Sequence, residues 1–292
     1  MARLPDAARA AARRLSPRHR RWRRLVDTLT LDPDRLPRPV EAPTPRDFIM
    51  CGCPRTGTAL LTAMLFQPPE VVTVMEPWDV MRLPPAELFR SLRAELATGR
   101  LGRGRLDLPA LERDGTVRWC RDGEIPHPVE AAPDHLLGVK FPAFWRYLDL
   151  LPQTRFLVCL RHPVAVVRSF ARVGGRLGEG LEYDTPFNRT MNAALIAATD
   201  EVAVRRVLLY DYVNQRVIPH LNRPNVMAVR FERWFTEPDA LVAEIAEFLG
   251  VDLRSGRARI GPGEDDGTDD EPTLAVVRRH CRTGEALGYA TR

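Results

Sequence analysis

The segment that most restricts the fold of this chain is a glycine-bounded loop between an apolar stretch and an amphipathic one. Residues 47–51 read DFIMC and predict a short strand, residues 52–57 read GCPRTG, and residues 58–66 have the apolar spacing of a helix. A strand, a tight turn and a helix in that order direct backbone N–H groups and the positive end of a helix dipole toward one point. This pattern predicts an α/β fold with a phosphate-binding loop.

The alternation of short apolar stretches and helical spacing continues along the chain. It predicts a three-layer α/β sandwich in which helices cover both faces of a central parallel sheet. Further strands are expected over residues 71–75, 136–141, 155–160 and 225–231, with helices from Pro163 and over 240–249.

Two parts of the chain depart from this alternation. Residues 1–45 are rich in arginine and proline and are expected to form an N-terminal basic arm in front of one domain over residues 46–292. Residues 79–135 carry helical pieces and loops rich in arginine, glycine and proline. We expect this helical insertion, together with the glycine-rich stretch 174–187, to line a substrate pocket.

The loop lacks two residues that a kinase or ATPase needs. Its glycine spacing matches the start of the pattern G-x-x-x-x-G-K-[ST], but Thr58 stands at the lysine position and Ala59 at the magnesium-binding hydroxyl. Those two groups hold the γ-phosphate and its metal ion. The loop therefore indicates a phosphate-bearing substrate and chemistry without a metal ion. A nucleotide kinase or NTPase-like phosphate-binding enzyme is the alternative.

Several motifs resemble those of the sulfotransferases that use 3′-phosphoadenosine 5′-phosphosulfate (PAPS). Residues 54–61, PRTGTALL, are similar to that family's 5′-phosphosulfate loop, P-[RK]-[ST]-G-[ST]-[ST]-L-L, with Ala59 as the departure. Arg161 and Ser169 have the spacing of its 3′-phosphate site, and Phe231 stands where some members place an aromatic ring near the adenine. The resemblance implies a P-loop-like sulfotransferase fold, with PAPS as co-substrate. The donor-binding residues that it implies are Cys53, Pro54, Arg55, Thr56, Gly57, Thr58, Ala59, Arg161, Ser169 and Phe231.

Three residues form the expected catalytic set. Glu76 follows the strand over 71–75 and Lys140 lies near the end of the strand over 136–141, and sites of α/β proteins lie at carboxyl ends of strands. Lys140 is also the only lysine among 43 Lys and Arg residues. These positions resemble those of tyrosylprotein and carbohydrate sulfotransferases. The resemblance implies that Glu76 is the general base, while Lys140 and Arg55 stabilise the transferring sulfuryl group.

Histidines are the rival bases, because cytosolic sulfotransferases of small molecules often use one. His127 and His135 lie in the insertion and are the two candidates, whereas His162 lies inside the 3′-phosphate motif and is expected to orient that loop. The choice between Glu76 and a histidine stays open at this point.

The composition indicates the cellular compartment and the partners to expect. No apolar run reaches the roughly 20 residues that span a bilayer. The arginine-rich start has no apolar core of a signal peptide, and the five cysteines form no CxxC pair, so we expect a cytoplasmic enzyme with reduced thiols.

The acceptor is expected to be a small molecule or natural product. No nucleic-acid motif accompanies the net charge of +5, and the N-terminal arm offers a surface for a homodimer.

Overall fold

The computed structural model describes most of the predicted domain. The described residues are 40–98, 129–183, 185–254 and 271–290, together with the backbone of residues 107–111 and 117–121. Most of the predicted N-terminal arm and the candidate base His127 lie outside the described residues.

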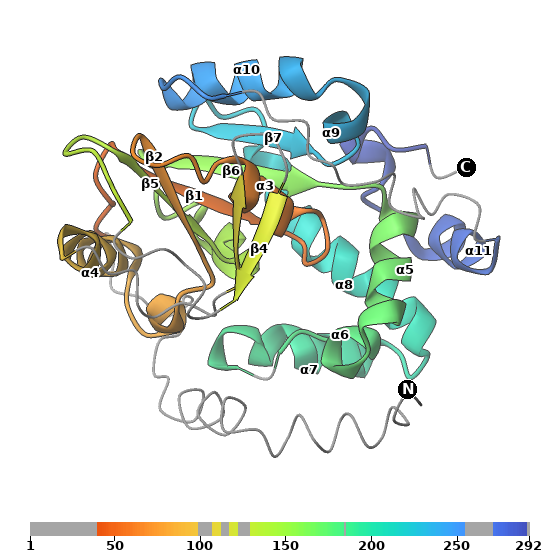
Figure 1. Cartoon of the computed structure of the whole chain (residues 1–292). Helices are drawn as coiled ribbons and strands as arrows, with labels where there is room; N and C mark the ends of the chain where they lie inside the picture. The colour runs from red at the N-terminus through yellow and green to blue at the C-terminus, as the bar shows by residue number, and fades with distance from the viewer. Residues whose placement is uncertain are drawn as a thin grey trace, which may run out of the picture.

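Five parallel strands form the central sheet, in the order β2-β5-β1-β6-β7 (Figure 1). All five were predicted, and each bound differs from the prediction by at most one residue. The strands are β1 (Asp47–Gly52), β2 (Val71–Met75), β5 (Leu136–Lys140), β6 (Arg155–Leu160) and β7 (Val226–Arg230). The parallel sheet confirms the predicted α/β architecture.

Helices cover both faces of this sheet, because successive side chains of a strand point to opposite faces. Phe48 and Met50 of β1 pack in one apolar cluster with residues of α3 and α10, whereas Ile49 and Cys51 pack in the cluster that contains α4, α5, α7 and α8. The helices are α3 (Thr58–Met64), α4 (Pro85–Ala97), α5 (Pro163–Val173), α6 (Gly175–Gly178), α7 (Arg189–Ala198), α8 (Val202–Val217), α9 (Arg233–Thr236), α10 (Pro238–Leu249) and α11 (Glu271–His280). Short 3₁₀ helices are η2 (Trp78–Met81), η3 (Pro142–Tyr147), η4 (Pro186–Asn188), η5 (Ile218–His220) and η6 (Glu285–Leu287).

The segment 79–135 contains more than the predicted helices and loops. Besides α4 it holds an antiparallel pair, β3 (Asp107–Leu111) and β4 (Val117–Arg121), which is separate from the main sheet. Sequence analysis missed this pair. Pro109 argues against a strand in the middle of a sheet, but a two-stranded ribbon consists of edge strands, where proline is tolerated.

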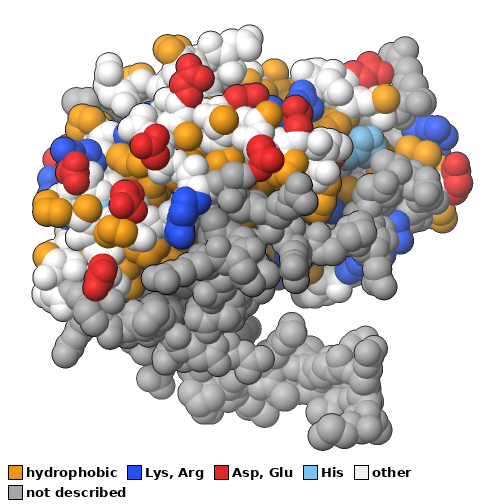
Figure 2. Space-filling model, turned by 45° about the horizontal axis from the view of Figure 1, so that its top comes forward, with side chains coloured by type: hydrophobic (Ala, Val, Ile, Leu, Met, Phe, Trp, Pro, Cys, Tyr) orange, Lys and Arg blue, Asp and Glu red, His pale blue; other side chains and the backbone are white. Residues whose placement is uncertain are grey.

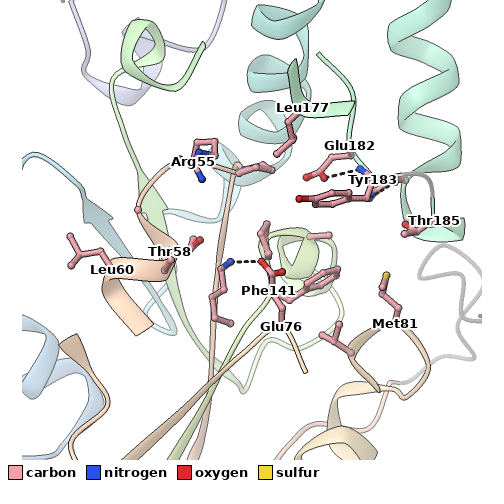
Figure 3. A pocket seen from close by; sticks show the side chains of 18 of the residues that line it. Arg55, Thr58, Leu60, Glu76, Met81, Phe141, Leu177, Glu182, Tyr183 and Thr185 are labelled. Carbon is pink, nitrogen blue, oxygen red and sulfur yellow. Dashed lines mark hydrogen bonds and ion pairs between the residues drawn. The ribbon is translucent and has the colours of Figure 1, made fainter. Parts of the chain in front are cut away.

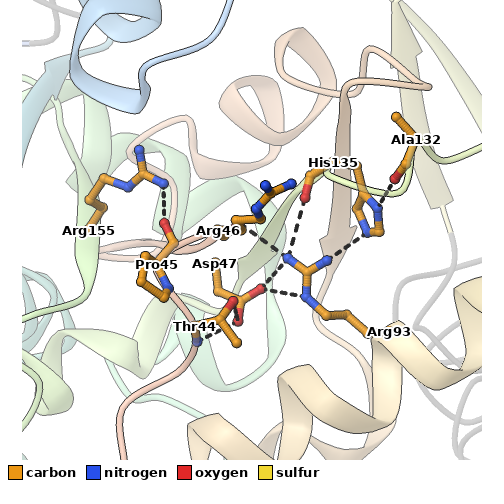
Figure 4. Close-up of polar contacts among 8 residues, drawn as sticks. All are labelled: Thr44, Pro45, Arg46, Asp47, Arg93, Ala132, His135 and Arg155. Atoms are coloured by element: carbon orange, nitrogen blue, oxygen red, sulfur yellow. Dashed lines mark hydrogen bonds and ion pairs between the residues drawn. The ribbon is translucent and has the colours of Figure 1, made fainter.

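A buried ion pair fixes α4 to the amino end of the sheet (Figure 4). Arg93 of α4 donates through Nη2 to Asp47 Oδ1 at 2.6 Å, and the side chain of Asp47 is 1% exposed. The Thr44 N–H and hydroxyl donate to the other oxygen of Asp47 at 2.8 and 2.7 Å. His135 contacts Arg93 at 3.1 Å and the Ala132 carbonyl at 2.7 Å, so its ring belongs to the same cluster. The cluster joins the start of β1, the start of β5 and α4.

The face of the molecule that carries α10 shows mixed charge. In Figure 2, acidic side chains are scattered among apolar and basic ones over the described residues of this face. A protein that binds nucleic acid gathers its basic residues into a patch or stripe. No such patch gathers among the described residues of this face, and the expectation about nucleic acid stays a prediction.

We predict that Arg93→Met lowers the free energy of unfolding by about 3 kcal/mol, because it leaves the buried Asp47 carboxylate without its cation. The matched control is Arg90→Met on the same helix. The side chains of Arg90 and of its partner Glu41 are both exposed, so this ion pair contributes little to stability. Chemical denaturation of both variants measures the difference. Equal effects would contradict this account of the cluster.

Candidate active site

The loops that follow β1, β2, β5 and β6 converge on one cavity of about 470 Å³ at the carboxyl edge of the sheet (Figure 3). Its wall includes nine of the twelve predicted site residues. They are Pro54, Arg55, Gly57, Thr58, Ala59, Glu76, Lys140, Arg161 and Phe231. Most of the predicted site is therefore brought together at one place, which lies where parallel-sheet proteins bind ligands.

The phosphate loop is held in a conformation that few residues adopt. Gly57 has φ 95°, and a Cβ atom there would lie 2.3 Å from the ring of Phe231. Arg55 has φ 72°, which is uncommon for a residue with a side chain. The Thr56 hydroxyl donates to the Cys53 carbonyl at 2.7 Å, and both side chains are buried. Cys53 and Thr56 therefore shape the loop from inside, and only their backbone groups can face a ligand.

The predicted 3′-phosphate residues lie against this loop. Arg55 Nε donates to Ser169 Oγ at 2.9 Å, and Arg161 Nη1 donates to the Arg55 carbonyl at 3.2 Å. The guanidinium of Arg161 also lies 4.1 Å from the ring centroid of Phe231. Two guanidinium groups, a hydroxyl and an aromatic ring thus meet, although they come from four segments of the chain. Cations, a hydroxyl and a ring are the groups that a nucleotide phosphate and base require.

Glu76 and Lys140 form a close ion pair in the cavity. Lys140 Nζ lies 2.5 Å from Glu76 Oε1, and the two side chains are 6% and 21% exposed. The Glu76 N–H also donates to the Lys140 carbonyl at 2.7 Å. Glu76 has φ 50°, so it and Arg55 are the two non-glycine residues with positive φ in the described part of the chain. Strained backbone of this kind clusters at functional sites.

Sequence analysis missed a second carboxyl group in the cavity, that of Glu182. Its side chain is 6% exposed, and its backbone is held by two hydrogen bonds to Asn192, at 2.9 and 3.0 Å. Burial, reinforced by the negative charge of Glu76, raises the pKa of Glu182 to about 7. No motif marked this residue, and the only available signal was its place in the glycine-rich stretch 174–187. That stretch does line the cavity, as predicted.

The described histidines do not line the cavity, which removes one rival base. His135 precedes β5 at the amino end of the sheet, whereas Lys140 ends the same strand at the cavity, so His135 does not lie where this alternative base was expected. His162 behaves as predicted: its Nδ1 accepts the Val164 N–H at 3.3 Å and caps α5. Of the described part of the insertion 79–135, Val80 and Met81 reach the cavity.

A family model described as "Sulfotransferase family" matches residues 45–255, which include every predicted site residue. The chain belongs to the sulfotransferase family. This membership disfavours the kinase alternative, in agreement with Thr58 and Ala59 in the loop.

Individual proteins show a more distant similarity to the chain. It is 28% identical over 229 residues to nodulation protein NoeE of Sinorhizobium fredii, and the match covers 72% of this chain and about half (51%) of that protein. A sulfotransferase from Alicyclobacillus acidocaldarius is 15% identical, with a TM-score of 0.43 and coverage of 85% of this chain and 100% of that one. Mouse sulfotransferase SULT7A1 complexed with PAP is 12% identical, with a TM-score of 0.38 and coverage of 92% and 72%.

We predict a pH-dependent stability difference between this sulfotransferase and its Glu182→Gln variant. The pKa of Glu182 is raised from 4.5 to about 7 in the folded state, so the folded protein binds this proton more tightly than the unfolded chain. The stability that this proton contributes is present at low pH and lost as pH rises through about 7. The variant should gain up to about 3 kcal/mol relative to wild type between about pH 5 and pH 8. Denaturation at both pH values measures this, and a constant difference would contradict it.

Proposed function

We propose that this sulfotransferase transfers the sulfuryl group of PAPS to a hydroxyl of a small-molecule acceptor, such as a natural product. The observation that supports this most is the pair of Glu76 and Lys140, held 2.5 Å apart in the same cavity as the phosphate loop. An acid–base group and a buried cation are what an in-line displacement at sulfur requires.

The residues present fit such a donor. The loop backbone with Arg55 and Thr58 would hold the 5′-phosphosulfate, while Arg161 and Ser169 would hold the 3′-phosphate and Phe231 would lie beside the adenine. Support comes from the contacts of Arg55 with Ser169 and of Arg161 with Phe231. PAPS supplies an activated sulfuryl group on a phosphate leaving group. Pro54 shapes the loop, and Ala59 offers the donor no hydroxyl.

In this proposal the two members of the ion pair have different roles in the reaction. Glu76 accepts the proton of the acceptor hydroxyl as that oxygen attacks sulfur. Lys140 and Arg55 stabilise the negative charge that develops on the sulfuryl oxygens and on the bridging oxygen. Because these fixed cations can neutralise that charge, we propose a reaction without a metal ion.

The cellular setting remains a proposal as well. Four cysteines, Cys51, Cys53, Cys159 and Cys281, are free thiols in the described part of the chain, which fits the reducing cytoplasm. Among the described residues, no helix is long and apolar enough to cross a membrane. A homodimer through the N-terminal arm stays a prediction.

We predict micromolar or tighter binding of 3′-phosphoadenosine 5′-phosphate (PAP), the leaving nucleotide, without added metal. Arg161→Ala should weaken binding at least about tenfold, because it removes a charge-assisted contact to the 3′-phosphate. Calorimetric titration measures both proteins. Arg172→Ala, at the exposed end of α5, is the matched control and should bind as wild type does. Binding of ATP only with magnesium, and none of PAP, would overturn the proposal.

We predict that Glu76→Gln lowers kcat about 10²–10⁴-fold while the Kd for PAP stays unchanged, because the amide cannot accept the proton. The measurement is PAP release from PAPS with the best acceptor from a panel of alcohols and phenols. Glu70→Gln, an exposed site just before β2, is the control for the same chemical change. A Glu76→Gln enzyme with wild-type kcat would show that another group is the base.

A further inference from the structure

The part of the cavity wall formed by Leu177, Glu182, Tyr183, Thr185 and Asn188 contains buried polar atoms without a hydrogen-bond partner among the described residues. Thr185 Oγ1 and Asn188 Oδ1 make no hydrogen bond within the described part of the chain. Thr185 is 2% exposed and Asn188 is 3% exposed, and both line the cavity. Unsatisfied buried polar groups are costly and rare in native proteins, so each calls for an explanation. A ligand in the cavity can supply the missing partners.

The Glu182 carboxyl group adds a third oxygen site on the same wall. In Figure 3 the side chains of Glu182, Tyr183 and Thr185 lie along one side of the cavity, and Glu76 lies below them. The Glu182 carboxyl accepts one local hydrogen bond, from the Tyr183 N–H at 3.2 Å, which leaves it further acceptor capacity.

Asn188 Oδ1 and the Glu182 carboxylate accept hydrogen bonds, and the Thr185 hydroxyl can donate or accept, so a group that both donates and accepts fits this wall. The Asn188 amide nitrogen is already committed to the Tyr183 carbonyl at 3.2 Å, so its free oxygen is an acceptor only. A hydroxyl donor suits this wall better than an ammonium, because Lys140 and Arg146 already act on Glu182 as nearby positive charges. Apolar side chains complete the cavity and can contact a carbon framework. They are Val80, Met81, Phe141 and Leu177.

We propose that Glu182, Thr185 and Asn188 form an acceptor subsite that binds a second hydroxyl group next to the one that is sulfated. The acceptor is then a diol or polyol on a compact apolar framework, and not a simple alcohol. This inference rests on the proposed function, since it assumes that the attacked hydroxyl lies beside Glu76.

A matched pair of probes tests the subsite: cis-1,2-cyclohexanediol and cyclohexanol, which differ by one hydroxyl. Each is titrated into the PAP-saturated protein, and kcat/KM for transfer from PAPS is measured for each. Wild type should favour the diol at least about tenfold, because a site built for a hydroxyl rejects the analogue that lacks it. Thr185→Val and Asn188→Leu should bring that ratio close to one while PAP binding is retained. Thr98→Val, at the exposed end of α4, should keep the wild-type ratio.

The outcomes separate this inference from the proposed function. The subsite is overturned if wild type does not distinguish the diol from cyclohexanol, or binds neither of them. It is also overturned if the ratio stays unchanged in Thr185→Val and Asn188→Leu. In each of these cases, PAP binding still upholds the donor site. Tighter binding of cis-2-aminocyclohexanol than of the diol overturns the hydroxyl assignment in favour of an ammonium. Failure of wild type to bind PAP overturns the proposed function, and the subsite with it.

Discussion

The register between β2 and β5 determines where the centre of the site can form. Met75 pairs with Lys140, so Glu76, the next residue along, begins a loop beside the last residue of the neighbouring strand. Its N–H donates to the Lys140 carbonyl, and its side chain meets the Lys140 ammonium in the cavity. A shift of one residue would move these side chains to opposite faces. The ion pair is therefore a consequence of the sheet, and the amino-end cluster of Asp47 and Arg93 holds the opposite end of that sheet.

Local strain accompanies this arrangement. Arg55 and Glu76 hold positive φ angles, and Gly57 approaches the ring of Phe231 too closely for any side chain. Such conformations cost free energy, and the surrounding packing must maintain them. In return, Arg55 contacts Ser169 and Arg161 contacts both the loop and Phe231, so the groups proposed to hold the donor are already assembled. Preorganised charges need little rearrangement when the substrate reacts.

The features that sequence could predict are those with a local cause. Apolar stretches bounded by turn residues located all five strands of the central sheet, and the loop motif and the Arg161–Ser169 spacing located the residues that meet beside it. The local pair of β3 and β4 was missed, but the features of the site that were missed depend on long-range packing. His135 and Lys140 are close in sequence, yet a strand separates them and places them at opposite ends of the sheet. Glu182 has no motif, and only the fold shows that it lines the cavity with Glu76.

A crystal structure of the complex with PAP tests the central claim most directly, because it locates both phosphates. The account predicts the 5′-phosphate against the backbone N–H groups of residues 54–58 and the 3′-phosphate in contact with Arg161 and Ser169. Lys140 and Glu76 should then lie on the side of the 5′-phosphate that faces the Glu182 wall. PAP bound elsewhere, or with its 3′-phosphate away from Arg161 and Ser169, would contradict the assignment of this cavity as the sulfuryl donor site.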